Sequence, residues 1–269
     1  MSEVKKIATR MSYGNALVEL GKEHDDLLVF EADLGGATKT TIFRDVFPDR
    51  HIECGIAEAN MVGMAAGIST TGIVPFVSSF AMFALMRTIP GMVVICPSDD
   101  VEARAAVKAA YEYKGPVYMR FGRVAVPVIN DNPDYKFEIG KGVTLKDGND
   151  LTIIANGILV SEALQAAEML AKDGINARVI NIHTIKPLDK DLVIKAAKET
   201  GKIVTVEEHS VIGGLGSAVA DVVSEENLAP VHKIGVQDVF GESALAEELL
   251  EKHGLDAKGI YNNIKDYLN

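Results

Sequence analysis

The 269-residue sequence is poor in cysteine, because Cys54 and Cys96 are its only two. Two thiols are too few for a disulfide framework, and neither lies in a pattern spaced for metal ligation. Buried free thiols in a reducing cytoplasm are therefore expected. The N-terminal residues MSEVKKIATR lack the apolar core of a signal peptide. The longest apolar stretch, residues 72–86, is broken by a proline and two serines and is too short to span a bilayer. We expect a cytoplasmic protein with no membrane partner.

Positive charge is also scarce, since 27 lysines and arginines stand against 38 aspartates and glutamates, for a net charge of −11. Nucleic acid and anionic membranes both need a basic face, so neither is expected as a main partner. Solubility is the simplest role for this excess of negative charge. Apolar residues make up 48% of the chain and charged residues 24%, which is typical of a soluble protein with a substantial core.

Short apolar strands and helices alternate along the whole chain. LLVFEADL (27–34) and MVVICPSD (92–99) predict buried strands, and a polar stretch rich in Asn, Asp, Gly and Pro separates two series of such elements. Alternation of this kind indicates an α/β protein with right-handed crossovers. We expect two domains, residues 1–129 and 151–269, joined by a linker at 130–150, each a mainly parallel sheet flanked by helices.

Residues 51–83, HIECGIAEANMVGMAAGISTTGIVPFVSSFAMF, carry the candidate chemistry. The pattern predicts a strand, a helix of small residues with Glu58 in its first turn, an apolar strand, and then Phe80 and Phe83. The acid is either a helix N-terminal charge stabilised by the dipole or a buried proton handler, and spacing alone favours the first. An isolated F-x-x-F pair is likewise more often ordinary core.

Several of these motifs together resemble the transketolase family. GIAEANMVGMAAGIS followed by SSFAMF closely resembles the family's pyrimidine-binding domain. The likeness extends from ATRMSYGNAL (8–17) through EADLGGATKT (31–40) to VTVEEHSVIGGLGSAVA (204–220), in the family's order. It is strongest to the form split into two chains, of which this sequence resembles the C-terminal one. The resemblance implies a thiamine diphosphate pyrimidine-binding fold for residues 1–129 and a Rossmann-like transketolase C-terminal domain for residues 151–269.

The resemblance gives Glu58 a catalytic role with thiamine diphosphate. The matching acid of the family hydrogen-bonds a ring nitrogen of the aminopyrimidine and favours the imino tautomer of the exocyclic amine. That imine can then take the proton from the thiazolium carbon. Burial would help such a carboxyl group to keep its proton. Phe80 and Phe83 are expected to pack against the aminopyrimidine ring.

Three arginines and one acid complete the set that the resemblance implies. In the family, an arginine in the ATR-type opening and another in the GPVYMRFGR-type strand hold the sugar phosphate, and guanidinium suits that task. Arg10 and Arg123 match those positions, with Arg120 as a nearby candidate. Asp33 matches an acid close to the cofactor and the dimer interface. Without the resemblance, a surface salt bridge explains each of them equally well.

The second half of the chain contains one further pattern, Glu207, Glu208 and His209 followed by GGLG at 213–216. A glycine-rich turn before a helix can hold an anion. A lone turn of this kind more often serves tight packing between a strand and a helix, and we expect that here.

The family's G-D-G motif, which grips the diphosphate and its magnesium, does not occur in this sequence. K-D-G-N at 146–149 lies in the expected linker, the wrong context for it. We therefore expect no metal ligands in this chain and a partner, the transketolase N-terminal subunit, that binds the diphosphate and Mg²⁺. Thiamine diphosphate would then be shared between the two subunits.

The sequence also lacks a segment after Phe83. In the family several dozen residues usually separate FAMF from the L-M-R-x-I-P-x-M run, whereas here that run begins at Leu85. The absent stretch normally supplies a helix, a strand and a loop with the histidine and acids that handle the sugar. No histidine remains between His51 and His183. Either this sequence omits a segment, or the chain has a true internal deletion near residues 84–85; in the second case the shortened pyrimidine-binding domain would lack one strand.

The reaction implied is two-carbon ketol transfer between phosphosugars, in the pentose phosphate pathway, by a heterotetramer in which this chain dimerises. One alternative is a relative with the same cofactor, a deoxyxylulose-phosphate synthase or the beta chain of a 2-oxoacid dehydrogenase, but IVPFVSSFAMF and LMRTIPGM favour transketolase. A second alternative, supported by the absent segment, is a catalytically impaired assembly subunit. An unrelated Rossmann-like domain is disfavoured because no G-x-G-x-x-G follows a strand.

Overall fold

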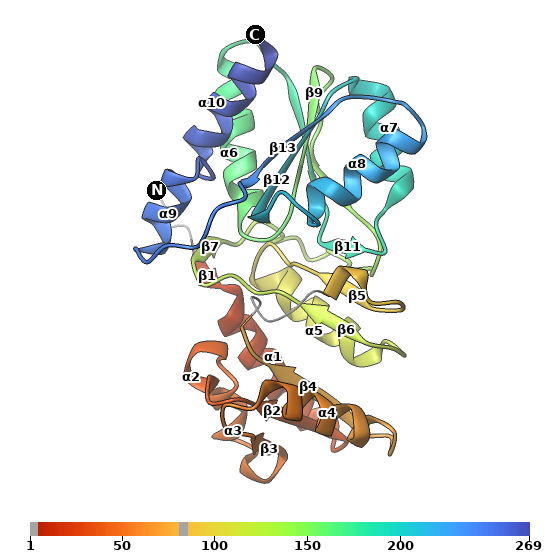
Figure 1. The fold of residues 1–269 in the computed structure, drawn as a ribbon, viewed down its shortest axis with the longest axis vertical. Helices are drawn as coiled ribbons and strands as arrows, with labels where there is room; N and C mark the ends of the chain where they lie inside the picture. Colours follow the sequence, from red (N-terminus) through yellow and green to blue (C-terminus); the bar gives the residue numbers. More distant parts are fainter. Residues whose placement is uncertain (1–4, 81–85) are drawn as a thin grey trace.

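The computed structural model describes residues 5–80 and 86–269 and contains two α/β domains stacked along the long axis of the molecule (Figure 1). The N-terminal domain lies at the bottom of the view and the C-terminal domain at the top. The predicted fold class, with mainly parallel sheets flanked by helices, is confirmed. Within the described residues, no helix combines the length and the apolar character needed to cross a membrane.

The first half of the N-terminal domain is a parallel sheet in the order β3-β2-β4. Its strands are β2 (Leu27–Glu31), β3 (His51–Glu53) and β4 (Val74–Ser78). The apolar run of β2 is buried on both faces, as expected for a central parallel strand. Around the sheet lie α1 (Thr9–Glu23), α2 (Gly35–Thr38), α3 (Thr41–Arg44), the 3₁₀ turn η1 (Pro48–Arg50) and α4 (Glu58–Ser69).

The second half of this domain is a separate three-stranded sheet in the order β11-β5-β6. Its elements are the 3₁₀ turn η3 (Met86–Thr88), β5 (Val93–Ile95), α5 (Asp100–Glu112) and β6 (Val117–Met119). The strand β11 (Thr184–Lys186) comes from the C-terminal half of the sequence and pairs antiparallel with β5. Helix α1 packs against α5 and so holds the two halves together. Among the described residues, β4 pairs only with β2 and β6 only with β5.

The C-terminal domain has one continuous five-stranded sheet in the order β13-β12-β9-β10-β8, parallel except for β8. The strands are β8 (Val143–Lys146), β9 (Leu151–Ala155), β10 (Ala177–Asn181), β12 (Ile203–Ser210) and β13 (Val231–Val236). Helices α6 (Leu159–Lys172) and α10 (Ala257–Leu268) cover one face, and α7 (Lys190–Thr200) and α8 (Leu215–Glu225) cover the other. The short helix α9 (Ala246–Lys252) precedes α10.

The stretch expected to be a linker does more than connect the domains. Residues 143–146 within it form β8, the edge strand of the C-terminal sheet. Before it, β7 (Ala125–Pro127) pairs antiparallel with β1 (Lys6–Ala8). The polar composition of 130–150 concealed β8 because an edge strand with one exposed side needs few apolar residues.

Candidate functional site

The candidate site is built at the carboxyl edge of the β3-β2-β4 sheet. The register places Glu31 of β2 beside Glu53 of β3 on one side and Ser78 of β4 on the other. The chain leaves all three strands at this edge, so the segments that follow must share the same end of the sheet. Asp33 and Phe80 each come two residues after this row, and ligands bind at such an edge in open α/β sheets.

Glu31 organises the loop that carries Asp33. Its carboxylate is fully buried and accepts hydrogen bonds from the backbone N–H groups of Ala32 and Leu34, both at 3.1 Å. Its other oxygen accepts from the hydroxyls of Thr38 at 2.7 Å and Thr40 at 2.6 Å. Four donors satisfy a charge that would otherwise be costly to bury, and they fix the course of residues 31–40.

Glu53 joins that loop to the start of the next one. Asp33 has a positive φ of 57°, and its N–H donates to Glu53 Oε1 at 2.8 Å. The N–H of Gly55 donates to the same oxygen at 3.1 Å. A left-handed backbone at a non-glycine residue is strained and persists only where its surroundings impose it, as these bonds do here. The side chain of Asp33 is exposed at the sheet edge.

Glu58 is the first residue of α4, as the sequence predicts. Its side chain is half-buried, and it has no hydrogen-bond or ion-pair partner within residues 5–80 and 86–269. The helix dipole favours a carboxylate at this end. The described residues bury the Glu58 side chain only in part, whereas the proton-handling role needs a buried carboxyl group. Further burial must come from outside the described residues.

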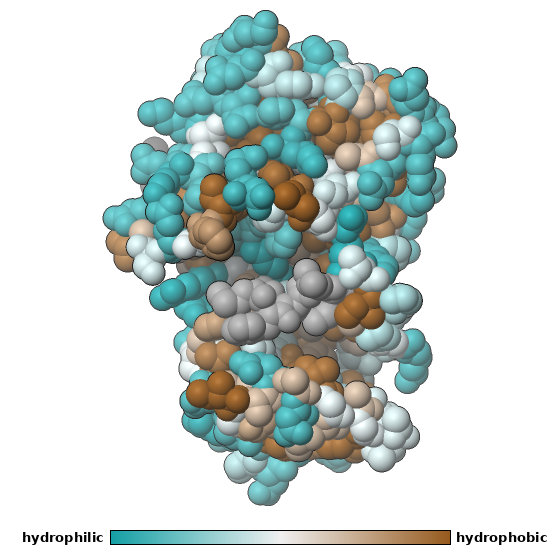
Figure 2. Space-filling model, in the orientation of Figure 1, coloured by the Kyte–Doolittle hydropathy of each residue, from teal (hydrophilic) through white to brown (hydrophobic). Residues whose placement is uncertain are grey.

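The surface beside Glu58 is apolar. Helix α4 buries only Met61 and Ala65, whereas Ile56 before it is 81% exposed and Val62 on it is 55% exposed. Phe80 is 44% exposed at the same edge, and Phe83 lies outside the described residues. Figure 2 shows apolar side chains gathered on the N-terminal domain in this view. Exposed patches of this kind mark interaction or ligand surfaces.

Arg10 and Arg123 lie in neighbouring segments. The N–H of Gly122 donates to the hydroxyl of Thr9 at 2.9 Å, and Ala8 pairs with Ala125 across β1 and β7. Arg10 Nη1 donates to the carbonyl of Ala37 at 3.1 Å, while its Nε is buried with no hydrogen-bond partner among the described residues. Arg123 is exposed, and no described residue forms an ion pair with it. The two guanidinium groups therefore retain donors for an anion.

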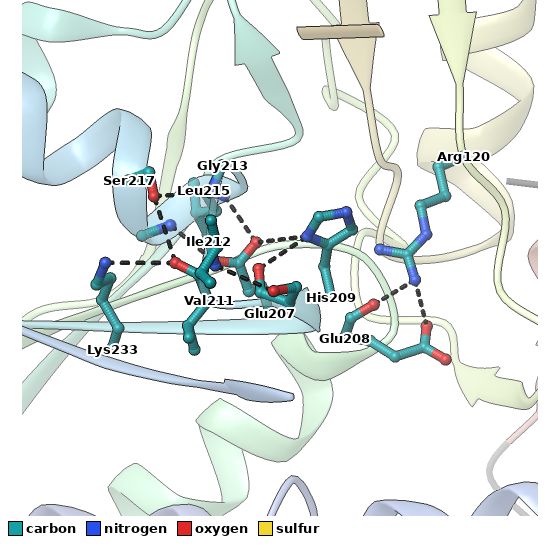
Figure 3. A network of polar contacts seen from close by, with 12 residues as sticks. Arg120, Glu207, Glu208, His209, Val211, Ile212, Gly213, Leu215, Ser217 and Lys233 are labelled. Carbon is teal, nitrogen blue, oxygen red and sulfur yellow. Dashed lines mark hydrogen bonds and ion pairs between the residues drawn. The ribbon is translucent and has the colours of Figure 1, made fainter. Parts of the chain in front are cut away.

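Arg120 is engaged elsewhere. Its guanidinium donates to the carbonyl of Glu208 and lies 3.7 Å from the carboxylate of the same residue (Figure 3). Burial raises the pKa of Glu208, and the Arg120 charge opposes that rise. The pair links β6 to β12 across the domain boundary. Arg120 is therefore engaged within this chain, and its expected role at a sugar phosphate stays a prediction.

The glycine-rich turn at 213–216 is filled by the protein itself. Glu207 is buried, and its carboxylate accepts from the N–H of Leu215 at 2.7 Å and of Gly216 at 2.8 Å (Figure 3). A Cβ on Gly214 would collide with that carboxylate. Burial raises the pKa of Glu207, and the two backbone bonds oppose the rise. The start of α8 is therefore closed to an external anion, and the tight packing expected from the sequence accounts for the glycines.

Half of a thiamine diphosphate site fits the residues present. Glu58, which pairs with no described residue, and the exposed ring of Phe80 follow strands of one sheet at the same edge, an arrangement that suits an aminopyrimidine. The buried Nε of Arg10, which no described residue bonds, suits an anionic ligand. The described residues include no comparable set that suits the diphosphate and its Mg²⁺. Across the described part of the chain, no cluster of three or more His, Cys, Asp or Glu could hold a metal ion.

The sequence did not predict a role in the candidate site for four residues: Glu31, Glu53 and the buried pair of Tyr13 and Ser78. The Tyr13 hydroxyl and Ser78 Oγ lie 2.8 Å apart and join α1 to the end of β4. The one available signal was that Glu31 and Glu53 each follow strand-like residues. Their role depends on strand register, which local pattern does not give.

Comparison with known families gives two matches that together span most of the chain. Residues 140–260 match the family model described as the transketolase C-terminal domain. The transketolase pyrimidine-binding domain matches residues 5–86 and, in a second piece, residues 82–128. The match therefore breaks at 82–86, where the sequence indicates an absent segment.

Among individual proteins, the putative transketolase C-terminal section of Methanocaldococcus jannaschii is 42% identical over 303 residues, covering 96% of this chain and 95% of that protein. One chain of the apulose-4-phosphate transketolase of Phocaeicola vulgatus is 36% identical over 306 residues, covering 97% and 98%. Both alignments are longer than the 269 residues of this chain, so they include residues of the relatives that have no counterpart here.

A solved structure described as a split gene transketolase, inactive beta4 tetramer, has a TM-score of 0.88 and 44% sequence identity, covering 97% of this chain and 98% of its own. Human transketolase is 35% identical, and this chain spans 49% of its length.

Proposed function

This chain belongs to the transketolase family, and we propose that it is the C-terminal subunit of a split, thiamine diphosphate-dependent transketolase. With a partner subunit it would transfer two-carbon ketol groups between phosphosugars, in the cytoplasm and within the pentose phosphate pathway. The observation that carries the proposal is the gathering of Glu58, Phe80 and Asp33 at one sheet edge that lacks any metal-holding cluster among the described residues. Such an edge suits the pyrimidine half of the cofactor and requires another chain for the rest.

Each residue of this edge has a defined task in the proposal. When bound, thiamine diphosphate supplies the electron sink for breaking and making the carbon–carbon bond. Glu58 would hold a proton at the pyrimidine nitrogen, and Phe80 would pack against the ring, a task also expected of Phe83, which lies outside the described residues. Arg10 and Arg123 hold the sugar phosphate, and Asp33 lies near the interface between the subunits. The diphosphate and Mg²⁺ are held by the N-terminal subunit.

Assembly with other chains is supported by the exposed apolar surface around α4 and by the relatives. The similar solved structure is described as an inactive beta4 tetramer, and two of the relatives are named as transketolase subunits. We therefore propose a dimer of this chain within a heterotetramer. A related enzyme remains the alternative, because a 1-deoxy-D-xylulose-5-phosphate synthase of Heliobacterium modesticaldum is 32% identical over 292 residues, although this chain spans 45% of it.

The break at 82–86 favours a second candidate, a catalytically impaired assembly subunit. Mixing the chain with a diphosphate-domain subunit, thiamine diphosphate and Mg²⁺ distinguishes the two candidate functions. Size-exclusion chromatography measures assembly, and ketol transfer from a ketose phosphate measures turnover. The proposed enzyme gives both. Assembly without turnover supports the assembly subunit instead.

Glu58→Gln tests the proton-handling role in that same mixture. Loss of a general acid or base lowers kcat by roughly 10²–10⁴-fold, so we expect turnover to fall by at least that lower limit while assembly persists. Glu112→Gln is the matched control, because Glu112 is an exposed acid at the end of α5. Full activity in Glu58→Gln would remove Glu58 from the mechanism.

A further inference from the structure

Two acids on neighbouring strands hold the loops at the carboxyl edge of the β3-β2-β4 sheet. Strand register places Glu31 of β2 beside Glu53 of β3. Three consecutive backbone N–H groups donate to these acids in alternation, Ala32 and Leu34 to Glu31 and Asp33 to Glu53. Hydrogen bonds from N–H groups to a carboxylate are charge-assisted and stronger than those between neutral groups. Both acids together therefore set the course of the loop that carries Asp33.

The two acids differ in what their removal would do. Glu31 is fully buried and accepts from four donors, so its removal would leave buried donors without partners. Glu53 is exposed, and one of its oxygens, Oε1, accepts both of its hydrogen bonds. Water can bond an exposed N–H when a side chain is removed, and exposed substitutions usually change stability little. Glu53 can therefore restrict the course of the loops without being needed for the fold.

The second bond of Glu53 reaches the segment that leads into α4. The N–H of Gly55 donates to Glu53 Oε1 at 3.1 Å, and the N–H of Ala57 donates to the carbonyl of Gly55 at 2.8 Å. Ala57 is the N-cap of α4, and its carbonyl accepts from the N–H of Met61 at 2.9 Å. A continuous series of hydrogen bonds thus leads from Glu53 to the first turn of α4, which carries Glu58.

Residues 55–57 have few other restraints. Gly55 has a positive φ of 65°, and a Cβ there would meet no atom of a described residue within 4 Å beyond its chain neighbours. The Ile56 side chain is 81% exposed. Among the side chains of the described residues, only Glu53 hydrogen-bonds this segment. Helix α4 itself buries only two of its 12 residues. The direction in which the chain enters α4 at Glu58 therefore depends on the bond to Glu53.

We propose that Glu53 is a positioning residue, which holds Glu58 and Asp33 at a fixed separation through their backbones and touches neither substrate nor cofactor. One oxygen of Glu53 accepts from the loops that carry both acids. A displacement of about 1 Å can lower a catalytic rate by about 10²-fold, so this restraint matters for proton transfer at Glu58. The proposal rests on the proposed function for its effect on turnover, whereas its effect on the two loops is measurable on the chain alone.

Backbone order parameters from NMR relaxation test the restraint without a partner subunit or cofactor. Glu53→Ala removes the acceptor of both N–H groups. We expect order parameters of about 0.85 at Asp33 and Gly55 in the unaltered chain and below about 0.6 in Glu53→Ala, with the same urea midpoint. Glu112→Ala, a change of an exposed acid at the end of α5, is the control and should leave both loops rigid. Rigid loops in Glu53→Ala would overturn the proposal.

Two further variants test the effect on turnover, in the mixture with a diphosphate-domain subunit, thiamine diphosphate and Mg²⁺. Glu53→Gln keeps an oxygen in the place of Oε1 but removes the charge. Glu53→Asp keeps the charge but is shorter by one CH₂ group. We expect Glu53→Ala and Glu53→Asp to lower kcat at least about tenfold, while assembly and the KM for the ketose phosphate stay unchanged. Glu53→Gln should retain most of the activity.

These measurements distinguish a failure of the positioning role from a failure of the proposed function. If the unaltered chain shows no turnover in the mixture, the proposed function is wrong, and the order parameters alone decide whether Glu53 restrains the two loops. Full turnover in Glu53→Ala overturns the positioning role, as does rescue by Glu53→Asp in place of Glu53→Gln. A loss of kcat in Glu53→Ala that is accompanied by a large fall in the urea midpoint also overturns it, because Glu53 would then serve the fold as a whole.

Discussion

The two domains contain similar elements, but only one has an unbroken sheet. In the C-terminal domain five adjacent strands are covered on both faces, and α6 alone buries seven residues in the core. Among the described residues of the N-terminal domain the strands form two groups of three and the separate pair β1-β7, and α4 buries only Met61 and Ala65. The difference shows that α1 can hold the two parts of a divided sheet together while one face of α4, and strand edges of β4 and β6 that no described residue pairs with, stay uncovered.

The C-terminal domain also stabilises part of its neighbour. Strand β11 adds to β5, and the N–H of Cys96 donates to the carbonyl of His183 at 2.8 Å. Buried Glu102 accepts from the N–H of Ser98 at 2.7 Å and from Asn181 Nδ2 at 2.9 Å. The β5-β6 half is thus bonded to the C-terminal domain, whereas the β3-β2-β4 half depends mainly on α1.

The largest effect should come from truncating the core of α1. Leu17→Ala and Leu170→Ala each remove a fully buried leucine, which destabilises by about 2–5 kcal/mol. Leu17→Ala should unfold the β3-β2-β4 half first, because α1 is its main connection, and Leu170→Ala should destabilise the C-terminal domain. Hydrogen exchange followed by mass spectrometry along a urea series distinguishes the two. If Leu17→Ala made both domains lose protection from hydrogen exchange at the same urea concentration, the contrast between the two domains would be wrong.

A smaller effect is expected from Glu102→Gln at the domain boundary. The amide would direct a donor toward groups that already donate, and a buried unsatisfied polar group destabilises by about 1–3 kcal/mol. Exchange at the Cys96 amide, which bonds to the β11 side, should accelerate while exchange in β9 stays unchanged. Glu112→Gln, an exposed change on the same helix, is the control and should leave the Cys96 amide protected.

The smallest effect concerns pH. Burial lowers the pKa of His183 below its ordinary value of 6.5, so the unfolded chain binds its proton first as pH falls. Stability contributed by the neutral ring is complete above pH 6.5 and declines below it, with a slope of at most about 1.4 kcal/mol per pH unit for one proton. His183→Gln should reduce that slope in urea unfolding between pH 7 and pH 5, roughly the range in which histidine titrates. An unchanged slope would assign the acid sensitivity to other groups, such as His51, whose pKa burial also lowers.

Much of this architecture could be predicted from the sequence, because local pattern determines it. The start of α4 at Glu58 and the place of Asp33 after β2 followed from apolar runs and glycine positions. The bridge from Glu53 to Asp33 could not be predicted, since it depends on strand register. The contact of Arg120 with Glu208 could not be predicted for a similar reason, because Glu208 lies 88 residues away in the sequence. The expected role of Phe83 concerns a residue outside the described part of the chain.

The exchange of β11 into the neighbouring sheet has a mechanical consequence. Any hinge motion between the domains would have to break the pairing of Thr184–Lys186 with β5. It would also have to break the 2.6 Å hydrogen bond from Lys186 Nζ to the carbonyl of Ile89. Bending is therefore unfavourable at this boundary, and the β5-β6 half should move with the C-terminal domain as one block. Motion between the two blocks is therefore expected in the β3-β2-β4 half, which carries Asp33 and Glu58. A docking partner could shift these two acids without disturbing the C-terminal domain.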